Sequence, residues 1–160
     1  MREASISSAF QDGKTGNWYA LDQDAESLAT LQACYNPELG VVPIHATIRD
    51  IIKERVQLPQ ADFLYAAGLF DYLDELIAIS LLKALFALLQ PKGRLLIANF
   101  ASDSQDRGYM ESIMDWWLIY RTEEDLIQLV AELPNQQNIE TKIFRDDCNR
   151  IIYLEVQRLS

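Results

Sequence analysis

A short apolar run that ends at a glycine constrains the fold of this chain more than any other feature. Residues 63–67 read Phe-Leu-Tyr-Ala-Ala, the pattern of a strand that is buried on both faces of a parallel sheet. Gly68 follows directly, and a long apolar stretch begins at Leu76. Because ligands bind outside the carboxyl ends of the strands in open α/β sheets, we expect Gly68 at the rim of a site. An ordinary strand-to-helix turn would give the same local pattern.

Strand-like and helix-like segments alternate along the rest of the chain. Apolar periodicity predicts strands over residues 18–21, 41–45, 63–67 and 94–100, and helices over residues 25–35, 48–55, 76–89 and 123–133. Two final segments with period-two alternation flank a polar turn and predict an antiparallel hairpin. The predicted fold class is therefore α/β: a Rossmann-like, mostly parallel sheet with helices on both faces and a C-terminal antiparallel hairpin. Residues 1–16 are predicted to be a polar arm, and residues 17–160 one domain.

Composition excludes several classes of function. The net charge of −10 and a pI near 4.5 argue against partners that need a basic face, such as nucleic acid or anionic membrane surfaces. There is neither an apolar run of about 18 residues for a membrane span nor an apolar secretory signal, so we expect a cytoplasmic protein. Cys34 and Cys148 match no metal or redox spacing, and His45 is the single histidine, so no metal site is expected.

An acid follows the first predicted strand. Asp22 ends this strand, and Asp24 precedes the next predicted helix. An acid in this position can accept hydrogen bonds from both ribose hydroxyls of a nucleotide. Alternatively, either aspartate simply caps the helix.

The order of strand, acid and helix, followed by further strand-helix units and a closing hairpin, resembles a class I S-adenosylmethionine-dependent methyltransferase. The Pro-Lys-Gly turn before the strand at 94–100 also fits this family. The resemblance implies S-adenosylmethionine as the cofactor. It implies cofactor contacts at three strand ends: Asp22 with Gln23 at the ribose, Ala46, Thr47 and Ile48 at the adenine, and Ala67 with Gly68 beneath the methionine moiety.

A narrower resemblance is carried by AGLFDYL at 67–73, Asn99-Phe100 and YMESIMDWWLIYRTEEDL at 109–126. These segments are similar to a bacterial group of methyltransferases related to 3-hydroxy fatty acid methyl ester synthases. The resemblance implies O-methylation of a small-molecule acceptor, with a fatty-acid carboxylate as the expected class.

A carboxylate acceptor is already ionised near neutral pH, so it needs an anchor more than a base. Arg121 is the predicted anchor, because a guanidinium binds carboxylates bidentately. Asn99 and Tyr109 are predicted to orient the acceptor. Glu111, Trp116 and Tyr120 are predicted to bind it. The alternative is that the aromatic residues pack one amphipathic helix on the sheet, with Arg121 paired to a neighbouring acid: Glu111, Asp115 or Glu124.

The chain departs from the family pattern at its start, where no apolar strand with a glycine-rich loop precedes Trp18. We therefore expect the C-terminal part of a longer protein. The missing central strand would be supplied by residues 5–10, by a second copy in a homodimer, or by a further N-terminal segment. The alternative function is a non-catalytic α/β binding or dimerisation module.

Overall fold

The computed structural model describes residues 7–34 and 40–160, and the chain divides into two compact units. The first unit is Met1–Val56 and the second is Gln57–Ser160. Each unit is described by itself.

The first unit is built on two parallel strands, β1 (Trp18–Asp22) and β2 (Val41–His45). Helix α2 (Ser8–Gln11) precedes them, α3 (Ala25–Cys34) packs on both strands, and α4 (Ile48–Ile52) follows β2. Asp22 and His45 are register partners, so the carboxyl ends of the two strands lie side by side. The strand and helix order of this unit was therefore predicted correctly.

Two expectations for the first unit need correction. The helix predicted over 48–55 ends at Ile52, because the chain turns at Lys53 and Glu54 takes a left-handed φ of 52°. The segment proposed as a substitute strand, residues 5–10, forms helix α2 from Ser8 onward. Residues 5 and 6 lie outside the described residues.

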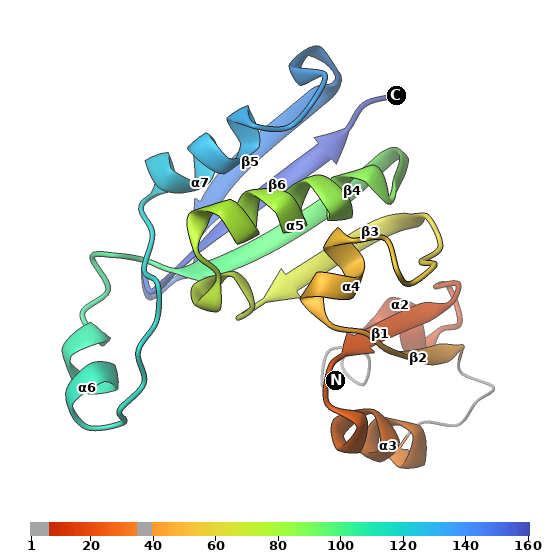
Figure 1. Cartoon of the computed structure of the whole chain (residues 1–160), viewed down its shortest axis with the longest axis horizontal. Helices are drawn as coiled ribbons and strands as arrows, with labels where there is room; N and C mark the ends of the chain where they lie inside the picture. Colours follow the sequence, from red (N-terminus) through yellow and green to blue (C-terminus); the bar gives the residue numbers. More distant parts are fainter. Residues whose placement is uncertain (1–6, 35–39) are drawn as a thin grey trace. The chain divides into compact units, whose positions relative to one another are not determined.

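The second unit is a four-stranded sheet with the order β3-β4-β6-β5 (Figure 1). Strands β3 (Ala61–Ala67) and β4 (Leu89–Phe100) are parallel, and β6 (Ile151–Arg158) runs antiparallel to β4 and to β5 (Ile139–Arg145). The connecting elements are η2 (Phe70–Tyr72), α5 (Glu75–Ala87), α6 (Arg107–Ser112), α7 (Glu123–Ala131) and η3 (Gln136–Asn138). The closing hairpin was thus predicted correctly.

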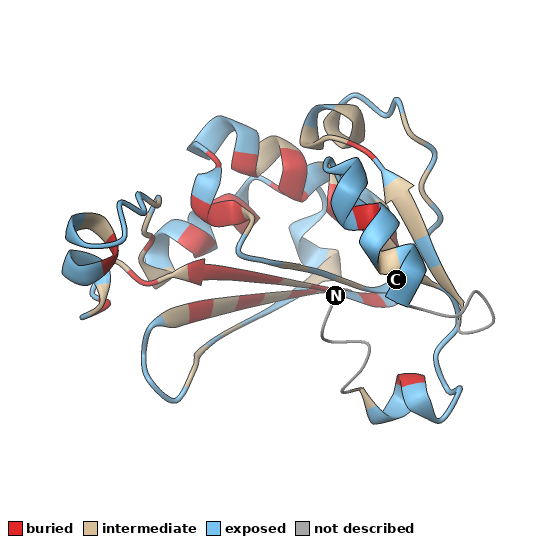
Figure 2. Ribbon diagram, turned by 90° about the horizontal axis from the view of Figure 1, so that it is seen from below, coloured by how far each residue is buried: buried red, intermediate tan, exposed pale blue. Residues whose placement is uncertain are grey.

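The core of this unit lies between the sheet and the helices α5 and α7, which cover the same face (Figure 1). Alternate residues of β6 are buried, and in β4 Leu95 and the consecutive residues 97–99 are buried; buried strand residues are red in Figure 2. Buried leucines of the two helices complete the core; the main members are Leu81, Leu82, Leu95, Ile97, Leu126, Leu129, Leu154 and Val156. Since α5 and α7 lie on one face, the covering of both faces stays a prediction.

The Pro-Lys-Gly segment that was expected to separate helix and strand lies inside β4. Lys92 takes a left-handed φ of 66°, and the chain then passes very close to its neighbours. A Cβ atom on Gly93 would lie 2.8 Å from the carbonyl oxygen of Gln90 and 3.0 Å from that of Ala61. The glycine is therefore required by close backbone packing.

No helix in the described ranges 7–34 and 40–160 is both long and apolar enough to span a bilayer.

Candidate functional site

The carboxyl ends of β1 and β2 bring together the residues predicted to bind the ribose and adenine. Asp22 is exposed, and its Oδ1 accepts a hydrogen bond of 2.9 Å from the Asp24 amide. The main-chain carbonyl of Gln23 lies 3.0 Å from Nε2 of His45, which joins the two strand ends. Asp24, in turn, accepts hydrogen bonds from Ser27 and the Glu26 amide, which lower its pKa and cap α3. Asp24 is thus the cap, and Asp22 presents a carboxylate at the strand end.

The turn after β2 is fixed by a capping box. The Ala46 amide donates to the Asp22 carbonyl, and Ala46 is buried. The Thr47 hydroxyl donates a hydrogen bond of 2.6 Å to the Asp50 carboxylate, and the Asp50 amide donates a hydrogen bond to the Thr47 hydroxyl oxygen. With this cap, α4 begins at Ile48. Ala46, Thr47 and Ile48 therefore form a short, well-held turn beside Asp22.

In the second unit, Ala67 and Gly68 leave β3 at the same rim at which β4 ends with Asn99 and Phe100, because the strands are parallel and Ala67 pairs with Ala98. Gly68 has a φ of 76°, and a Cβ placed there would meet no atom within 4 Å. The backbone at Gly68 is therefore exposed to an approaching ligand. That Asp22 shares this rim stays a prediction, since it belongs to the other unit.

Arg121 lies in the interior at this rim and is only 5% exposed. Its Nη1 donates to the Phe70 carbonyl at 2.7 Å and to Asn99 Oδ1 at 2.6 Å, and its Nη2 donates to the Leu73 carbonyl at 2.6 Å. Asn99 is fully buried and donates through Nδ2 to the carbonyls of Phe100 and Ile119. The guanidinium of Arg121 thus connects η2 and the following Leu73 to the end of β4 through hydrogen bonds.

Asp71 completes this buried polar network. Its Oδ1 accepts a hydrogen bond of 2.7 Å from the Phe100 amide. Burial raises the pKa of Asp71, and this effect is opposed by the Phe100 amide and by the charge of Arg121. Burial lowers the pKa of Arg121, opposed first by the Asp71 carboxylate. The two charges thus offset one another in a place from which water is excluded.

This geometry favours a positioning role for Arg121 and Asn99 over direct contact with an acceptor. Both side chains already bond to protein groups, and neither presents a face to solvent. The alternative ion pairs are not formed either: within the described residues, Arg121 makes no ion pair with Glu111, Asp115 or Glu124. Sequence reasoning missed the acceptors of Arg121 because two of them are main-chain carbonyls.

The aromatic segment does not form the single amphipathic helix that was considered for it. Helix α6 ends at Ser112, and Asp115 has a left-handed φ of 50°, after which the chain is extended to Arg121. Trp116 Nε1 donates to the hydroxyl of Tyr72 at 2.7 Å, and its ring meets Phe100 edge-on at 5.9 Å. Hydrogen bonds thus join the segments 71–77 and 109–119, which carry large exposed apolar side chains: Tyr72, Leu76, Ile77, Tyr109, Ile113, Met114, Trp117 and Ile119. We call these eight residues the apolar rim. A patch of this kind is typical of a binding surface.

Tyr120 differs from the other aromatic residues. Its ring lies 4.7 Å from the guanidinium carbon of Arg107, and Arg107 Nε donates to Glu111 at 2.9 Å. The Tyr120 hydroxyl is buried and has no hydrogen-bond partner, and the same holds for the hydroxyl of Ser104. Burial raises the pKa of Tyr120, and the Glu111 charge adds to this effect. Sequence reasoning included Tyr120 and Glu111 but missed Ser104 and Arg107.

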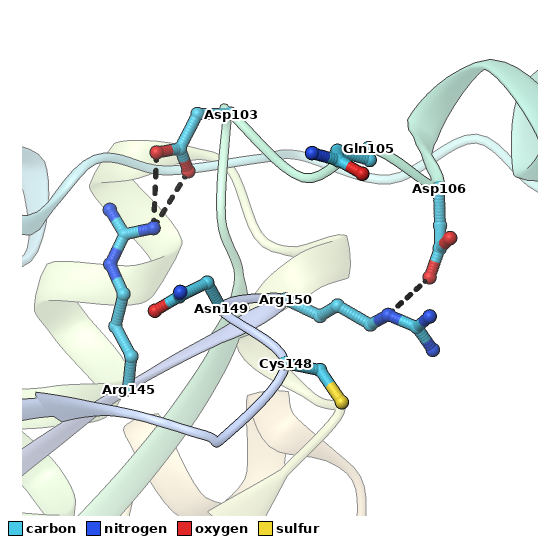
Figure 3. Close-up of a pocket in the computed structure, with 7 residues that line it drawn as sticks. All are labelled: Asp103, Gln105, Asp106, Arg145, Cys148, Asn149 and Arg150. Carbon is cyan, nitrogen blue, oxygen red and sulfur yellow. Dashed lines mark hydrogen bonds and ion pairs between the residues drawn. The ribbon is translucent and has the colours of Figure 1, made fainter.

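A polar pocket lies between the loop after β4 and the turn from β5 to β6 (Figure 3). Arg145 donates to both oxygens of Asp103, at 2.9 and 3.1 Å, and Arg150 pairs with Asp106 at 2.7 Å. Gln105, Cys148 and Asn149 also line it. Because both arginines are already paired with acids, the pocket is close to electrically neutral. No cluster of metal-ligating side chains occurs among the residues that the structure describes.

No protein-family model and no curated protein sequence matches this chain. Solved structures do match. A plantazolicin methyltransferase in complex with S-adenosylhomocysteine has a TM-score of 0.70 and 11% identity, and the match covers 90% of this chain and 68% of that one. Human N-acetylserotonin methyltransferase in complex with S-adenosylmethionine has a TM-score of 0.64 and 14% identity, with 90% and 41% covered. An O-methyltransferase family protein from Burkholderia thailandensis has a TM-score of 0.68 and 15% identity, with 91% and 44% covered.

At these identities the comparisons define the fold. The chain has the mixed α/β fold of S-adenosylmethionine-dependent methyltransferases, as the order of predicted strands and helices indicated. It spans less than half of the length of the last two structures.

Proposed function

We propose that this chain, alone or with a further polypeptide segment, acts as an S-adenosylmethionine-dependent methyltransferase on a small-molecule acceptor. The observation that carries the proposal is the fold shared with methyltransferases that were solved with S-adenosylmethionine or S-adenosylhomocysteine. In both units, the residues at the carboxyl ends of the parallel strands suit cofactor binding.

Each unit offers groups of the kind that bind this cofactor. Asp22 offers an exposed carboxylate that can accept charge-assisted hydrogen bonds from ribose hydroxyls, next to Gln23. The turn from Ala46 to Ile48 offers a backbone and an apolar side chain beside which adenine can lie. Ala67 and Gly68 leave their backbone open to the amino-acid end of the cofactor.

The cofactor supplies an electrophilic methyl group, and the chain must hold the acceptor in line with it and exclude water. A carboxylate oxygen needs no general base, since it is ionised near neutral pH. The apolar rim, together with Trp116, offers a surface on which an acyl chain loses contact with water. We therefore propose a carboxylic acid, of the fatty-acid class, as the acceptor. The similarity to the group related to 3-hydroxy fatty acid methyl ester synthases supports this class.

For such an acceptor, Arg121 and Asn99 position the rim, while Tyr109 and Glu111 on α6 face the acceptor. Homodimerisation stays a prediction, which a measurement of mass in solution tests.

Calorimetric titration with S-adenosylhomocysteine tests the proposal. The wild-type chain should bind, and Asp22→Asn should weaken binding about tenfold, because a charge-assisted hydrogen bond is about twice as strong as a neutral one. Asp12→Asn is the matched control: this acid is also exposed and lies in the first unit, where it pairs with Lys14. Asp12→Asn should leave the affinity unchanged.

If the wild-type chain does not bind S-adenosylhomocysteine, the methyltransferase proposal fails for this chain by itself. The alternative, a non-catalytic α/β binding or dimerisation module, would then be favoured. If it binds, mass spectrometry of a mixture with S-adenosylmethionine and octanoate checks whether a methyl ester is formed.

A further inference from the structure

The buried hydroxyl of Tyr120 is the most unusual polar group at the rim. Its backbone is fixed, because the next residue, Arg121, donates its amide to Phe100 and accepts from Ser102 at the extension of β4. The phenol oxygen nevertheless has no partner, although buried hydroxyl groups are nearly always hydrogen-bonded. A buried polar group without a partner costs free energy, so packing alone does not account for it.

A second hydroxyl in the same condition lies in the loop before α6, whereas Tyr120 lies in the segment after this helix. Ser104 is 7% exposed, and its Oγ also has no partner. The carbonyl of Ser104 accepts from the Arg107 amide, and the guanidinium of Arg107 covers the ring of Tyr120. Within the described residues, these two are the buried side-chain hydroxyls without a partner; Arg107 contacts Ser104 through its carbonyl and Tyr120 through its ring.

The contacts that hold the side chain of Arg107 are few. About half of its side chain is exposed, and it is held by one ion pair with Glu111 on the surface of α6 and by contact with the Tyr120 ring. Glu111 is partly buried, but an ion pair between residues four apart on a helix contributes little to stability. A ligand carboxylate could therefore take the place of Glu111 without unfolding the loop.

We propose that Arg107, Tyr120 and Ser104 form the subsite that binds the carboxylate of the acceptor. The inference rests on the proposed function for the identity of the acceptor. Arg107 supplies the bidentate cation that Arg121, being buried, does not present. The Tyr120 hydroxyl stays protonated over the neutral range, since its pKa is raised, and so it donates to a carboxylate oxygen. Ser104 donates a second hydrogen bond from the loop before α6, and the apolar rim receives the acyl chain.

A titration with sodium octanoate tests the subsite, with octan-1-ol as the neutral probe of the same chain length. The readout is the nuclear magnetic resonance signal of labelled tyrosine Cζ, in which Tyr120 is assigned by its loss in Tyr120→Phe. Octanoate should shift the Tyr120 signal. Arg107→Gln should weaken octanoate binding about tenfold or more, as expected for a lost charge-assisted pair. Octan-1-ol should bind wild type and Arg107→Gln equally.

Two matched controls separate binding from folding. Arg94→Gln removes an equally exposed arginine that pairs with Glu155, and Tyr153→Phe removes a hydroxyl elsewhere on the sheet. Both should leave octanoate affinity unchanged. Tyr120→Phe should weaken octanoate binding and yet leave the urea midpoint equal to that of wild type or above it, because its hydroxyl has no partner to lose.

The proposal is overturned if octanoate fails to shift the Tyr120 signal, if Arg107→Gln binds octanoate as well as wild type does, or if Tyr120→Phe lowers the urea midpoint. The last result would show that the hydroxyl has a structural partner. Failure here is distinct from failure of the proposed function, because binding of S-adenosylhomocysteine is measured without the acid. A chain that binds octanoate as described but not S-adenosylhomocysteine would keep the subsite and lose the methyltransferase assignment.

Discussion

Replacement of Arg121 is the sharpest perturbation of this structure, because it separates a positioning role from an anchoring role. In Arg121→Lys the charge remains, but one ammonium nitrogen cannot occupy the positions of both Nη1 and Nη2. These two atoms serve three acceptors, the carbonyls of Phe70 and Leu73 and Oδ1 of Asn99. At least one acceptor is then left buried without a partner.

The structure gives the size of the effect. A hydrogen bond that involves a charged group contributes about 1.5–3 kcal/mol, so Arg121→Lys should lower the free energy of unfolding by about 2 kcal/mol. Arg121→Met removes all three hydrogen bonds and leaves Asp71 as an uncompensated buried charge, which predicts a loss of about 3–5 kcal/mol. The free energy of unfolding should therefore decrease in the order wild type, Arg121→Lys, Arg121→Met.

The assay is urea unfolding followed by the fluorescence of Trp116 and Trp117, which both lie in the second unit. A Trp18→Phe background removes the single tryptophan of the first unit. Arg94→Lys is the control: this arginine is exposed and pairs with Glu155 at 3.7 Å, so it should change stability by less than about 1 kcal/mol. If Arg121→Lys is as stable as Arg94→Lys while octanoate affinity falls, Arg121 is an anchor and the positioning role is wrong.

Three further predictions use the same assay. Gly68→Ala should lower the free energy of unfolding by about 1–2 kcal/mol, because the φ of 76° at Gly68 is left-handed, although the space around it is open. Gly108→Ala in α6 should leave the stability unchanged or raise it. Equal effects of the two substitutions would contradict this prediction. Thr122→Ala should cost about 1 kcal/mol through loss of the capping box with Asp125, and Thr122→Ser should restore most of it; a neutral Thr122→Ala would show that the cap contributes nothing. Asp71→Asn tests the raised pKa of Asp71, which means that the folded state holds this proton more tightly than the unfolded state, whose pKa is about 3.9. The stability of wild type relative to Asp71→Asn should therefore fall as pH rises from below about 3.9 through the folded pKa. Above the folded pKa this difference should be constant. A relative stability that rises with pH would mean that the charge of Arg121 outweighs burial.

Local patterns predicted those parts of the fold that depend on neighbours in sequence. The start of α7 at Glu123 was predicted from local sequence, and the capping box of Thr122 and Asp125 that fixes it joins residues only three apart. Period-two alternation marked the strands β5 and β6, and the turn between them follows from the polar residues that separate them. Helix and strand ends differ by a few residues, as at Ile52, because the final turn depends on backbone geometry that composition does not display.

The candidate site was less predictable for a physical reason. Arg121 was identified by its type and its aromatic neighbours, but its acceptors include carbonyls 48 and 51 residues away, and every residue carries a carbonyl. Asn99 was placed correctly at the end of its strand, yet its role follows from complete burial, which no local pattern shows. The hydroxyl of Tyr120 gives no sequence signal at all, because the lack of a partner exists only in three dimensions.

The network around Arg121 and the contacts of Tyr120 with Arg107 differ in burial, although Tyr120 and Arg121 are neighbours in sequence. Behind the rim, Arg121, Asn99 and Asp71 join η2, the end of β4 and residue 119 through buried hydrogen bonds. In front, α6 contributes Arg107, which is held to Glu111 and Tyr120 at the surface. Tyr120 is adjacent to Arg121 in sequence, so the buried network sets the position of its backbone, while the half-exposed Arg107 lies against its ring. A substitution at Arg121 should therefore disturb acid binding indirectly, through the ring of Tyr120, whereas a substitution at Arg107 should change acid binding and leave stability almost intact.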